Sequence, residues 1–362
     1  MRVLCMNGGS SSLKFALYQG EERLAHGEEK LPGEAAAVQS ILASLDAADL
    51  HPHAVGHRIV HGGPVHHAPA LIDDQLLASL RELEHFAPLH LPAELAVIDA
   101  MARHYPGLPQ VACFDTHFHW DLPEVARRLP VPRKLHDQGV RRYGFHGLSY
   151  EYVVSALGAA QLGRAVIAHL GNGASLAAVR DGRPVDTTMA FTPGGGVMMG
   201  TRTGDLDPGI PLFLVARGAS SSDLERILER ESGLLGVSGT TPDMRELLAA
   251  REQDPRAALA VEMFSWSCRK AVGALAAALG GLDTLVFTGG IGENASAVRA
   301  QICAGLGHLG VTIDPAANQA GAALISSAGH RCTVRVIRTD EDLVVARHTA
   351  RLTGQGPPQA RP

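Results

Sequence analysis

Two arginines stand where a guanidinium could hold an anion. Arg58 lies in Gly56-His-Arg-Ile-Val-His-Gly-Gly63, where an apolar strand pattern ends in a glycine pair. Arg202 lies in residues 192–208, which carry too many glycines and prolines for a helix or a strand. Ordered irregular segments of this length usually serve a function. Because a guanidinium binds carboxylates and phosphates through two parallel hydrogen bonds, both arginines are candidates for binding an acidic substrate.

A carboxylate and an imidazole join this set. Asp115 directly follows the apolar run 111–114, and α/β proteins place catalytic groups at such strand ends. It is a candidate for acid/base work or for binding metal-bound water, although an Asp there also forms turns. His146 lies between Phe145 and Gly147, and a solitary histidine more often has a structural role than a catalytic one.

The 18 histidines raise the question of a zinc enzyme. His57 and His61 are four residues apart, and His117 and His119 alternate. The Ile-Val pair and the following glycines disfavour a helix that would bring His57 and His61 onto one face, and no H-E-x-x-H motif occurs. We therefore expect no zinc ion held directly by these histidine pairs.

The hydrophobic pattern predicts the elements that position these groups. The apolar run 2–6 ends in Asn7-Gly-Gly-Ser-Ser-Ser12, and alternating residues follow. The same pattern returns at 165–179 around Gly171-Asn172-Gly173. A strand, a turn of small residues and a second strand thus occur twice, which indicates an internal duplication, with two ordinary hairpins as the alternative.

Helices and strands alternate through the chain, as is typical of the α/β class. Apolar spacing near 3.6 predicts helices at 74–85, 92–104, 149–157, 222–231, 254–279 and 294–306. Strands are predicted at 55–60, 111–114, 284–288 and 334–337.

One glycine turn suggests a different activity. The predicted strand 284–288 runs into Gly290-x-Gly292-x-x-Ala295, which satisfies a relaxed dinucleotide-binding pattern with Asp314 at a suitable distance. An NAD-dependent oxidoreductase is therefore an alternative. Against it, the motif leaves too little chain for a full doubly wound domain. No G-x-x-x-x-G-K-[ST] motif occurs, so a P-loop fold is excluded.

The composition excludes several partners and compartments. With 46% hydrophobic and 19% charged residues, the sequence is of the globular type. A net charge of -5 gives no general attraction to nucleic acid, and the longest nearly apolar stretch, 271–282, is too short to span a membrane. Five cysteines without a C-x-x-C pair fit a reducing compartment, and the N-terminus lacks a signal-peptide pattern. We expect a cytoplasmic protein.

In this order the segments resemble the acetate kinase family, part of the superfamily of actin and the sugar kinases. Nine collinear segments carry the resemblance and make it highly specific. They are Asn7-Gly-Gly-Ser-Ser-Ser-Leu-Lys14, His57-Arg-Ile-Val-His-Gly-Gly63, Ala87-Pro-Leu-His90, Phe114-Asp-Thr116, Arg142-Tyr-Gly-Phe-His-Gly147, His169-Leu-Gly-Asn-Gly173, Met199-Gly-Thr-Arg-Thr-Gly-Asp-Leu-Asp-Pro208, Phe287-Thr-Gly-Gly-Ile-Gly-Glu-Asn294 and Thr339-Asp-Glu-Asp-Leu343.

The resemblance implies two duplicated actin-like ATPase domains, of the ribonuclease H-like type, around an interdomain nucleotide cleft. Residues 1–117 with 341–362 would form the N-terminal domain, to which the C-terminus returns. Residues 118–340 would form the C-terminal, nucleotide-binding domain. It also implies a homodimer and small-molecule substrates, while the composition, as stated above, predicts no nucleic-acid and no membrane partner.

The implied activity is reversible, direct in-line phosphoryl transfer between ATP and acetate, giving acetyl phosphate and ADP. The implied metal is Mg²⁺, with Mn²⁺ as its substitute. Propionate or another short-chain acid is the alternative substrate, because Gly194-Gly195-Gly196 stands where the family usually has Leu-Glu-Gly. A non-catalytic actin-like ATP-binding protein is the weaker alternative.

The resemblance also assigns residues by motif position. The catalytic residues are Asp115, His146 and Arg202. Arg58 would bind the substrate carboxylate, and the acyl group would contact Val60, Leu89, Phe145 and Pro193. Asn7 and Glu341 match the metal positions. The ATP positions are Ser10, Ser12, Lys14, His169, Leu170, Gly171, Asn172, Gly173, Asp243, Met244, Arg245, Gly290, Ile291, Gly292, Glu293 and Asn294.

Overall fold

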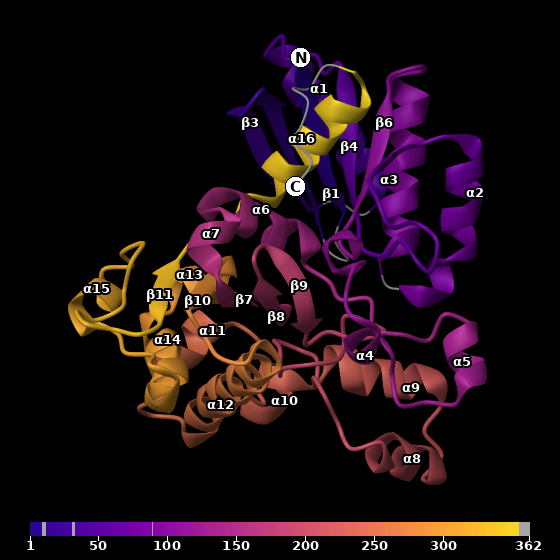
Figure 1. Cartoon of the computed structure of the whole chain (residues 1–362). Coiled ribbons are helices and arrows are strands. Elements are labelled where there is room, and N and C mark those ends of the chain that lie inside the picture. Colours follow the sequence, from indigo (N-terminus) through magenta and orange to yellow (C-terminus); the bar gives the residue numbers. More distant parts are fainter. Residues whose placement is uncertain (9–11, 31–32, 89, 355–362) are drawn as a thin grey trace. The chain divides into compact units, whose positions relative to one another are not determined.

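The computed structural model describes residues 1–8, 12–30, 33–88 and 90–354 (Figure 1). Its contacts divide the chain into two compact units. Unit 1 comprises Met1–Trp120, Gly147–Tyr152 and the described residues from Asp340, and unit 2 comprises Asp121–His146 and Val153–Thr339. The domain boundaries at 117/118 and 340/341 stay a prediction.

Unit 1 is built on a mixed six-stranded sheet in the order β3-β2-β1-β4-β6-β5. The strands β1, β2 and β3 are antiparallel neighbours, whereas β4 and β6 extend the sheet in parallel with β1. The strands are β1 (Arg2–Gly8), β2 (Leu13–Gln19), β3 (Glu22–Glu29), β4 (Ala54–Ile59), β5 (Ala70–Leu71) and β6 (Gln110–Phe114). The helical elements are α1 (Glu34–Ala47), α2 (Asp74–Glu82), η1 (Glu84–Phe86), α3 (Leu91–His104), η2 (His117–His119) and α16 (Glu341–Leu352).

Helices cover both faces of this sheet, as the alternation along β1 requires. Leu4 and Met6 point into a core shared with α1 and α3. Val3 and Cys5 point to the other face, where the apolar side of α16 packs. A Cβ atom at Gly56 would lie 2.4 Å from side-chain atoms of α16, so β4 and α16 meet where only glycine leaves room.

Unit 2 holds a five-stranded sheet in the order β11-β10-β7-β8-β9. Its strands are β7 (Arg164–Leu170), β8 (Ala174–Arg180), β9 (Arg183–Thr187), β10 (Thr284–Thr288) and β11 (Thr333–Val336). The helical elements before β10 are α4 (Glu124–Arg127), α5 (Arg133–Asp137), α7 (Ala159–Leu162), α8 (Gly209–Ala216), α9 (Ser221–Glu225), η3 (Arg226–Arg230), α10 (Gly233–Ser238), α11 (Met244–Ala250) and α12 (Pro255–Leu279). After β10 follow α13 (Gly289–Asn294), α14 (Ser296–Cys303), η4 (Gly307–Leu309) and α15 (Pro315–Gln319). Helix α6 (Gly147–Leu157) begins in unit 1 and ends in unit 2.

The two sheets share one topology. In each, the first strand pairs antiparallel with the second and the second with the third. In each, the first strand also pairs in parallel with a fourth, and the fourth with a fifth. The predicted α/β class and internal duplication are therefore confirmed, and the alternative of two isolated hairpins is wrong.

Several predicted elements differ in detail. The segment 222–231 is a short α-helix continued by a π-helical turn, η3. The predicted helix 294–306 is divided, because Gly289–Asn294 already forms α13 directly after β10 and α14 ends at Cys303. The predicted glycine turn at 290–294 is therefore helical. Among the described residues no helix is long and apolar enough to cross a membrane.

The buried guanidinium of Arg299 holds α13 in place. It is 1% exposed and donates to the backbone carbonyls of Gly292, Glu293 and Asn318 at 2.7–2.9 Å, and to the Asn318 side chain at 2.8 Å. Burial of a charged group is costly unless it is hydrogen-bonded, and these four bonds use four of the five N–H groups of the guanidinium.

Replacing Arg299 by methionine should therefore destabilise unit 2. Arg299→Met keeps an apolar stem but leaves the buried carbonyls without a donor, so the free energy of unfolding should fall by about 2–4 kcal/mol. The matched control Arg338→Met, whose side chain is 91% exposed, should change it by less than about 0.5 kcal/mol. Urea unfolding of both variants measures this, and equal values would contradict the role of Arg299.

Candidate functional site

In unit 1 the predicted residues Asn7, Arg58, Asp115 and Glu341 are in direct contact. The parallel register of β1 and β4 sets Asn7 opposite Arg58, and Asp115 follows β6, the next strand. The Arg58 guanidinium donates to both carboxylate oxygens of Asp115, and Nη1 donates to Asn7 Oδ1 at 3.0 Å. Glu341 begins α16, and its Oε2 lies 3.8 Å from Arg58 Nε. The ends of three neighbouring strands and the start of α16 thus bring together one cation, one amide and two carboxylates.

The charges of this group stabilise one another. Burial opposes the charged guanidinium, but the charges of Asp115 and Glu341 outweigh it and raise the pKa of Arg58. The Asp115 side chain is 1% exposed, so its carboxylate is ion-paired in a poorly solvated position. Burial raises the pKa of Glu341, and the positive charges of Arg58 and Lys14 oppose this.

A third carboxylate, the buried Glu94 of α3, lies beside this group and was missed from the sequence. Its Oε2 accepts the backbone N–H of Val60 at 3.0 Å. Burial raises its pKa to about 8, and the charge of Arg58 only partly offsets this. The available signal was a glutamate among Leu91, Leu95 and Ile98, the apolar face of a helix.

In unit 2, His146 and Arg202 both approach Gly173 in the turn between β7 and β8. A Cβ atom at Gly173 would lie 3.5 Å from His146 Nε2 and from Arg202 Nη1. His146 has a left-handed backbone (φ 57°), its Nδ1 lies 2.8 Å from Ser175 Oγ, and its ring stacks on His169 at 4.2 Å. These contacts fix the imidazole, so two groups able to bear positive charge lie close to one glycine turn.

The contacts of Arg202 explain why glycine stands at position 194, where the family usually has leucine. Arg202 Nη1 donates to the Pro193 carbonyl at 3.2 Å, and Arg202 Nε lies 3.6 Å from Glu229 Oε2. A Cβ atom at Gly194 would lie 2.1 Å from Glu229 Oε1. Glycine at 194 therefore leaves room for the carboxylate that accompanies Arg202. Glu229 was also missed from the sequence.

The two glycine segments predicted to bind nucleotide are neighbours. A Cβ atom at Gly292 would lie 3.7 Å from the Leu170 side chain, and one at Gly289 would lie 2.9 Å from the Leu170 carbonyl. Gly290 and Ile291 complete this turn of α13, and Asn294 Nδ2 donates to the Gly290 carbonyl at 2.8 Å.

One side chain and two backbone carbonyls connect these segments to their neighbours. Glu293 accepts the backbone N–H groups of Gly289 and Thr339. The Asn172 carbonyl accepts the N–H of Gly200, and the Gly173 carbonyl accepts that of Gly171.

The remaining predicted residues are dispersed. Asp243 caps α11 by accepting the Arg245 N–H at 2.8 Å, and Met244 is buried where α11 packs against α12. Lys14 is the exception among them, because it is the register partner of Asn7 on β1 and its positive charge acts on Glu341. Phe145 is buried in unit 2. Ser10 and Leu89 lie outside the described residues.

The motif that suggested NAD has a structural explanation. Asp314 caps α15 by accepting the Ala317 N–H at 2.7 Å, and the glycines at 290 and 292 lie within α13. Strand β10 lies in a mixed sheet, because β7 pairs antiparallel with β8.

Glu94 should make stability fall as the pH rises. Because burial raises its pKa in the folded protein from 4.5 to about 8, the folded state holds a proton that the unfolded state has lost in this window. The free energy of unfolding should therefore fall by up to about 1.4 kcal/mol per pH unit as the pH rises from 4.5 to 8.

The Glu94→Gln variant should lack this slope, since glutamine stays neutral and still accepts the Val60 N–H. The matched control Glu82→Gln, on the exposed surface of α2, should keep it. Urea unfolding at pH 5, 6, 7 and 8 measures the difference, and parallel curves for wild type and Glu94→Gln would contradict it.

Comparisons with known proteins find relatives that match nearly the whole chain. The family model described as Acetokinase family matches residues 25–347. An acetate kinase of Rhodopseudomonas palustris (strain ATCC BAA-98 / CGA009) is 45% identical, and the match covers 98% of this chain and 99% of the relative. An acetate kinase of Clostridium botulinum is 39% identical over 98% of this chain and 100% of the relative.

Solved structures give the same result. The acetate kinase of Porphyromonas gingivalis is 35% identical with a TM-score of 0.87, over 97% of this chain and 99% of the other. A propionate kinase from Francisella tularensis is 35% identical with a TM-score of 0.92, over the same shares. With the twin sheets and the strand-end cluster of Asn7, Arg58, Asp115 and Glu341, these matches show that the chain belongs to the acetokinase family.

Proposed function

We propose that this chain catalyses reversible, direct in-line phosphoryl transfer between ATP and acetate, giving acetyl phosphate and ADP. The observation that carries the proposal is the 45% identity to an acetate kinase over nearly the whole of both chains. The chemistry agrees with the residues, because phosphoryl transfer needs mainly positioning and stabilisation of negative charge. The chain supplies Arg58, Arg202 and His146 for these tasks.

Arg58 is proposed to bind the carboxylate of the acid. Its guanidinium is held at a strand end by Asp115 and Asn7, which restricts its rotamers before substrate arrives. A carboxylate substrate is a nucleophile at neutral pH without losing a proton. Asp115, already ion-paired with Arg58, is therefore proposed to orient the reactants rather than to act as a strong base.

His146 and Arg202 are proposed to stabilise the phosphoryl group in transfer. Charge on that group spreads over three oxygens, and positively charged donors held in place stabilise it. The stacking of His146 on His169 and the contacts of Arg202 with Pro193 and Glu229 supply this preorganisation.

Asn7 and Glu341 are proposed to hold Mg²⁺, with Mn²⁺ as a substitute. Their amide and carboxylate oxygens are the ligand types that hard cations prefer, and phosphate oxygens and water usually complete such a site. Burial raises the pKa of Glu341, and the positive charge of a bound cation would oppose this and favour the ionised carboxylate. When bound, the ion supplies neutralisation of phosphate charge.

ATP is proposed to bind at the glycine segments 171–173 and 290–294, with Lys14, Ser10, Ser12, His169, Leu170 and the segment 243–245 also contributing. Backbone N–H groups at glycine turns approach phosphates closely because no side chain intervenes. The contacts of Gly289 and Gly292 with Leu170 support a shared surface of these two glycine segments within unit 2.

The domain arrangement, the assembly and the compartment are proposed as the family implies them: two actin-like domains, 1–117 with 341–362 and 118–340, in a homodimer in the cytoplasm. Four apolar side chains of α8 are 43–70% exposed: Ile210, Leu212, Phe213 and Val215. Contiguous exposed apolar residues often mark protein interfaces, which supports an oligomer. The five cysteines are free and buried, which suits a reducing compartment.

Arg202→Ala should act on the chemical step. Loss of a cationic donor to the transferring group should lower kcat about 10³-fold or more, with a much smaller change in the KM for ATP. Arg202→Lys, which keeps the charge but not the planar fork, should recover part of the rate. Steady-state kinetics of ADP formation decide this, and an Arg202→Ala kcat within tenfold of wild type would refute the role.

The proposed acyl residues Val60, Leu89, Phe145 and Pro193 predict a limited choice of acid. A methylene in an apolar pocket is worth about 1–3 kcal/mol, so propionate should be discriminated modestly and longer acids excluded by overlap. Propionate is the alternative acid, because the structural relative from Francisella tularensis is a propionate kinase.

A hydroxamate assay of acyl phosphate with ATP, Mg²⁺ and acetate, propionate or butyrate tests both the activity and the acid. Val60→Ala should raise kcat/KM for propionate and butyrate relative to acetate and leave the KM for ATP nearly unchanged. No acyl phosphate from any acid would overturn the proposed activity. Identical acid ratios in wild type and variant would remove Val60 from the acyl pocket.

A further inference from the structure

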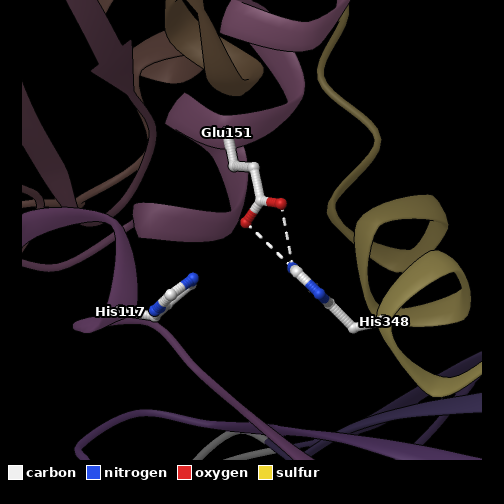
Figure 2. A group of neighbouring side chains, drawn as sticks. All are labelled: His117, Glu151 and His348. Carbon is white, nitrogen blue, oxygen red and sulfur yellow. Dashed lines mark hydrogen bonds and ion pairs between the residues drawn. The ribbon is translucent and has the colours of Figure 1, made fainter. Parts of the chain in front are cut away.

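We propose that His117, Glu151 and His348 form a binding site for a divalent transition-metal ion, with Zn²⁺ as the best-suited ion. The three side chains converge in unit 1, as Figure 2 shows, and one ligand atom of each lies within 4.8 Å of the others. This site is distinct from the proposed Mg²⁺ position at Asn7 and Glu341, and it does not rest on the proposed function.

Three separate elements supply the three side chains. His117 begins η2, Glu151 lies in α6 and His348 lies near the end of α16. Helix α16 packs against β1, β4 and β6, and η2 follows β6 by two residues. The ligands therefore stand on packed elements rather than on long loops, as a preorganised site requires.

His117 has the orientation of a metal ligand. Its Nδ1 is hydrogen-bonded to the backbone carbonyl of His67, so Nδ1 carries the proton and donates. The Nε2 lone pair is then left for an ion, and this pairing of one ring nitrogen with a carbonyl is the usual support of metal-binding histidines. Burial lowers the pKa of His117, which favours the neutral ring that coordination requires.

His348 and Glu151 form the other half of the site. His348 Nε2 lies 2.9 Å and 3.0 Å from the two carboxylate oxygens of Glu151, and the His348 side chain is 5% exposed. Without metal, Nε2–H donates to the carboxylate. A bound Zn²⁺ would take the place of that proton on Nε2 and bond a Glu151 oxygen, and the displaced proton would move to Nδ1, so that the ring stays neutral.

Glu151 is suited to a cation. Burial alone would raise its pKa, but the hydrogen bond and charge of His348, together with His117 and Arg351, outweigh burial and lower the pKa. The carboxylate is therefore ionised, as a ligand must be.

Arg351 competes with the metal. Its Nη2 donates to His348 Nδ1 at 3.1 Å, whereas a metal-bound His348 with a neutral ring carries its proton on Nδ1. Because Arg351 is exposed, its guanidinium can turn into solvent. Removing this donor should therefore tighten metal binding.

The donor set selects the ion. Two imidazole nitrogens and one carboxylate suit Zn²⁺ and its neighbours Co²⁺, Ni²⁺ and Cu²⁺, whereas Mg²⁺ prefers oxygen ligands only. Three protein ligands leave a fourth tetrahedral position for water. An ion here would link α16, which begins with Glu341, to η2, which closely follows Asp115.

The test is to titrate full-length, chelator-treated protein with Zn²⁺ in the presence of excess Mg²⁺ and to measure the heat of binding by calorimetry. Wild type should bind one equivalent of Zn²⁺, and His117→Ala and Glu151→Gln should each weaken that binding by about 100-fold or more. The matched control His104→Ala, which removes an exposed histidine of the same unit, should bind like wild type. Arg351→Gln should bind more tightly than wild type.

Co²⁺ gives a second readout that reports coordination directly. Wild type with one equivalent of Co²⁺ should develop visible d–d absorption bands that are absent in His117→Ala. Zn²⁺ should raise the Tm of wild type and not that of His117→Ala. If circular dichroism shows that His117→Ala is misfolded, His117→Gln replaces it.

An ordinary His348–Glu151 ion pair with His117 as a bystander predicts different results. Wild type and His117→Ala would then bind Zn²⁺ equally, or wild type would bind none. Either outcome, or the loss of binding in His104→Ala, overturns the proposed site.

Discussion

The guanidinium of Arg58 is the charge around which unit 1 is arranged. A largely buried cation is tolerated only among acceptors, and these acceptors come from β1, from the residue after β6 and from the start of α16. The parallel register of β1, β4 and β6 aligns the strand ends, and α16 must pack against the same sheet for Glu341 to approach Arg58. The polar cluster therefore forms only when the strands and α16 of unit 1 are packed as they are.

The duplication supplies the same strand ends twice and with different chemistry. In unit 1 the fourth strand, β4, carries charged Arg58 one residue before its end, and charged Asp115 directly follows the fifth strand, β6. In unit 2 the corresponding strands β10 and β11 end at glycine-rich α13 and at the segment that donates to Glu293. One topology therefore provides side-chain charge in one unit and close backbone approach in the other.

Burial beside these strand ends shifts the protonation of carboxylates in two directions. In the described part of the chain no cation forms an ion pair or hydrogen bond with Glu94, and burial raises its pKa to about 8. Glu151 is half-buried, and its interactions with His348, His117 and Arg351 outweigh the effect of burial and lower its pKa. Glu94 is 2% exposed, whereas the Glu151 side chain is 27% exposed and has an imidazole partner. Burial and partner together therefore set the charge of each carboxylate, which its position in a helix alone does not reveal.

The sequence by itself determined the α/β class, the duplication, the family and the strand-end positions of Arg58 and Asp115, because hydrophobic periodicity and glycine turns are local properties of the chain. Only the tertiary structure decided that Glu94 lies beside Val60, that Glu229 accompanies Arg202 across the space left by Gly194, and that His117 meets Glu151 and His348 rather than His119. His348 lies 197 residues from Glu151 in the chain, and no spacing rule connects them. Such contacts depend on sheet register and on the packing of α16, which bring distant residues together only after the whole unit has folded.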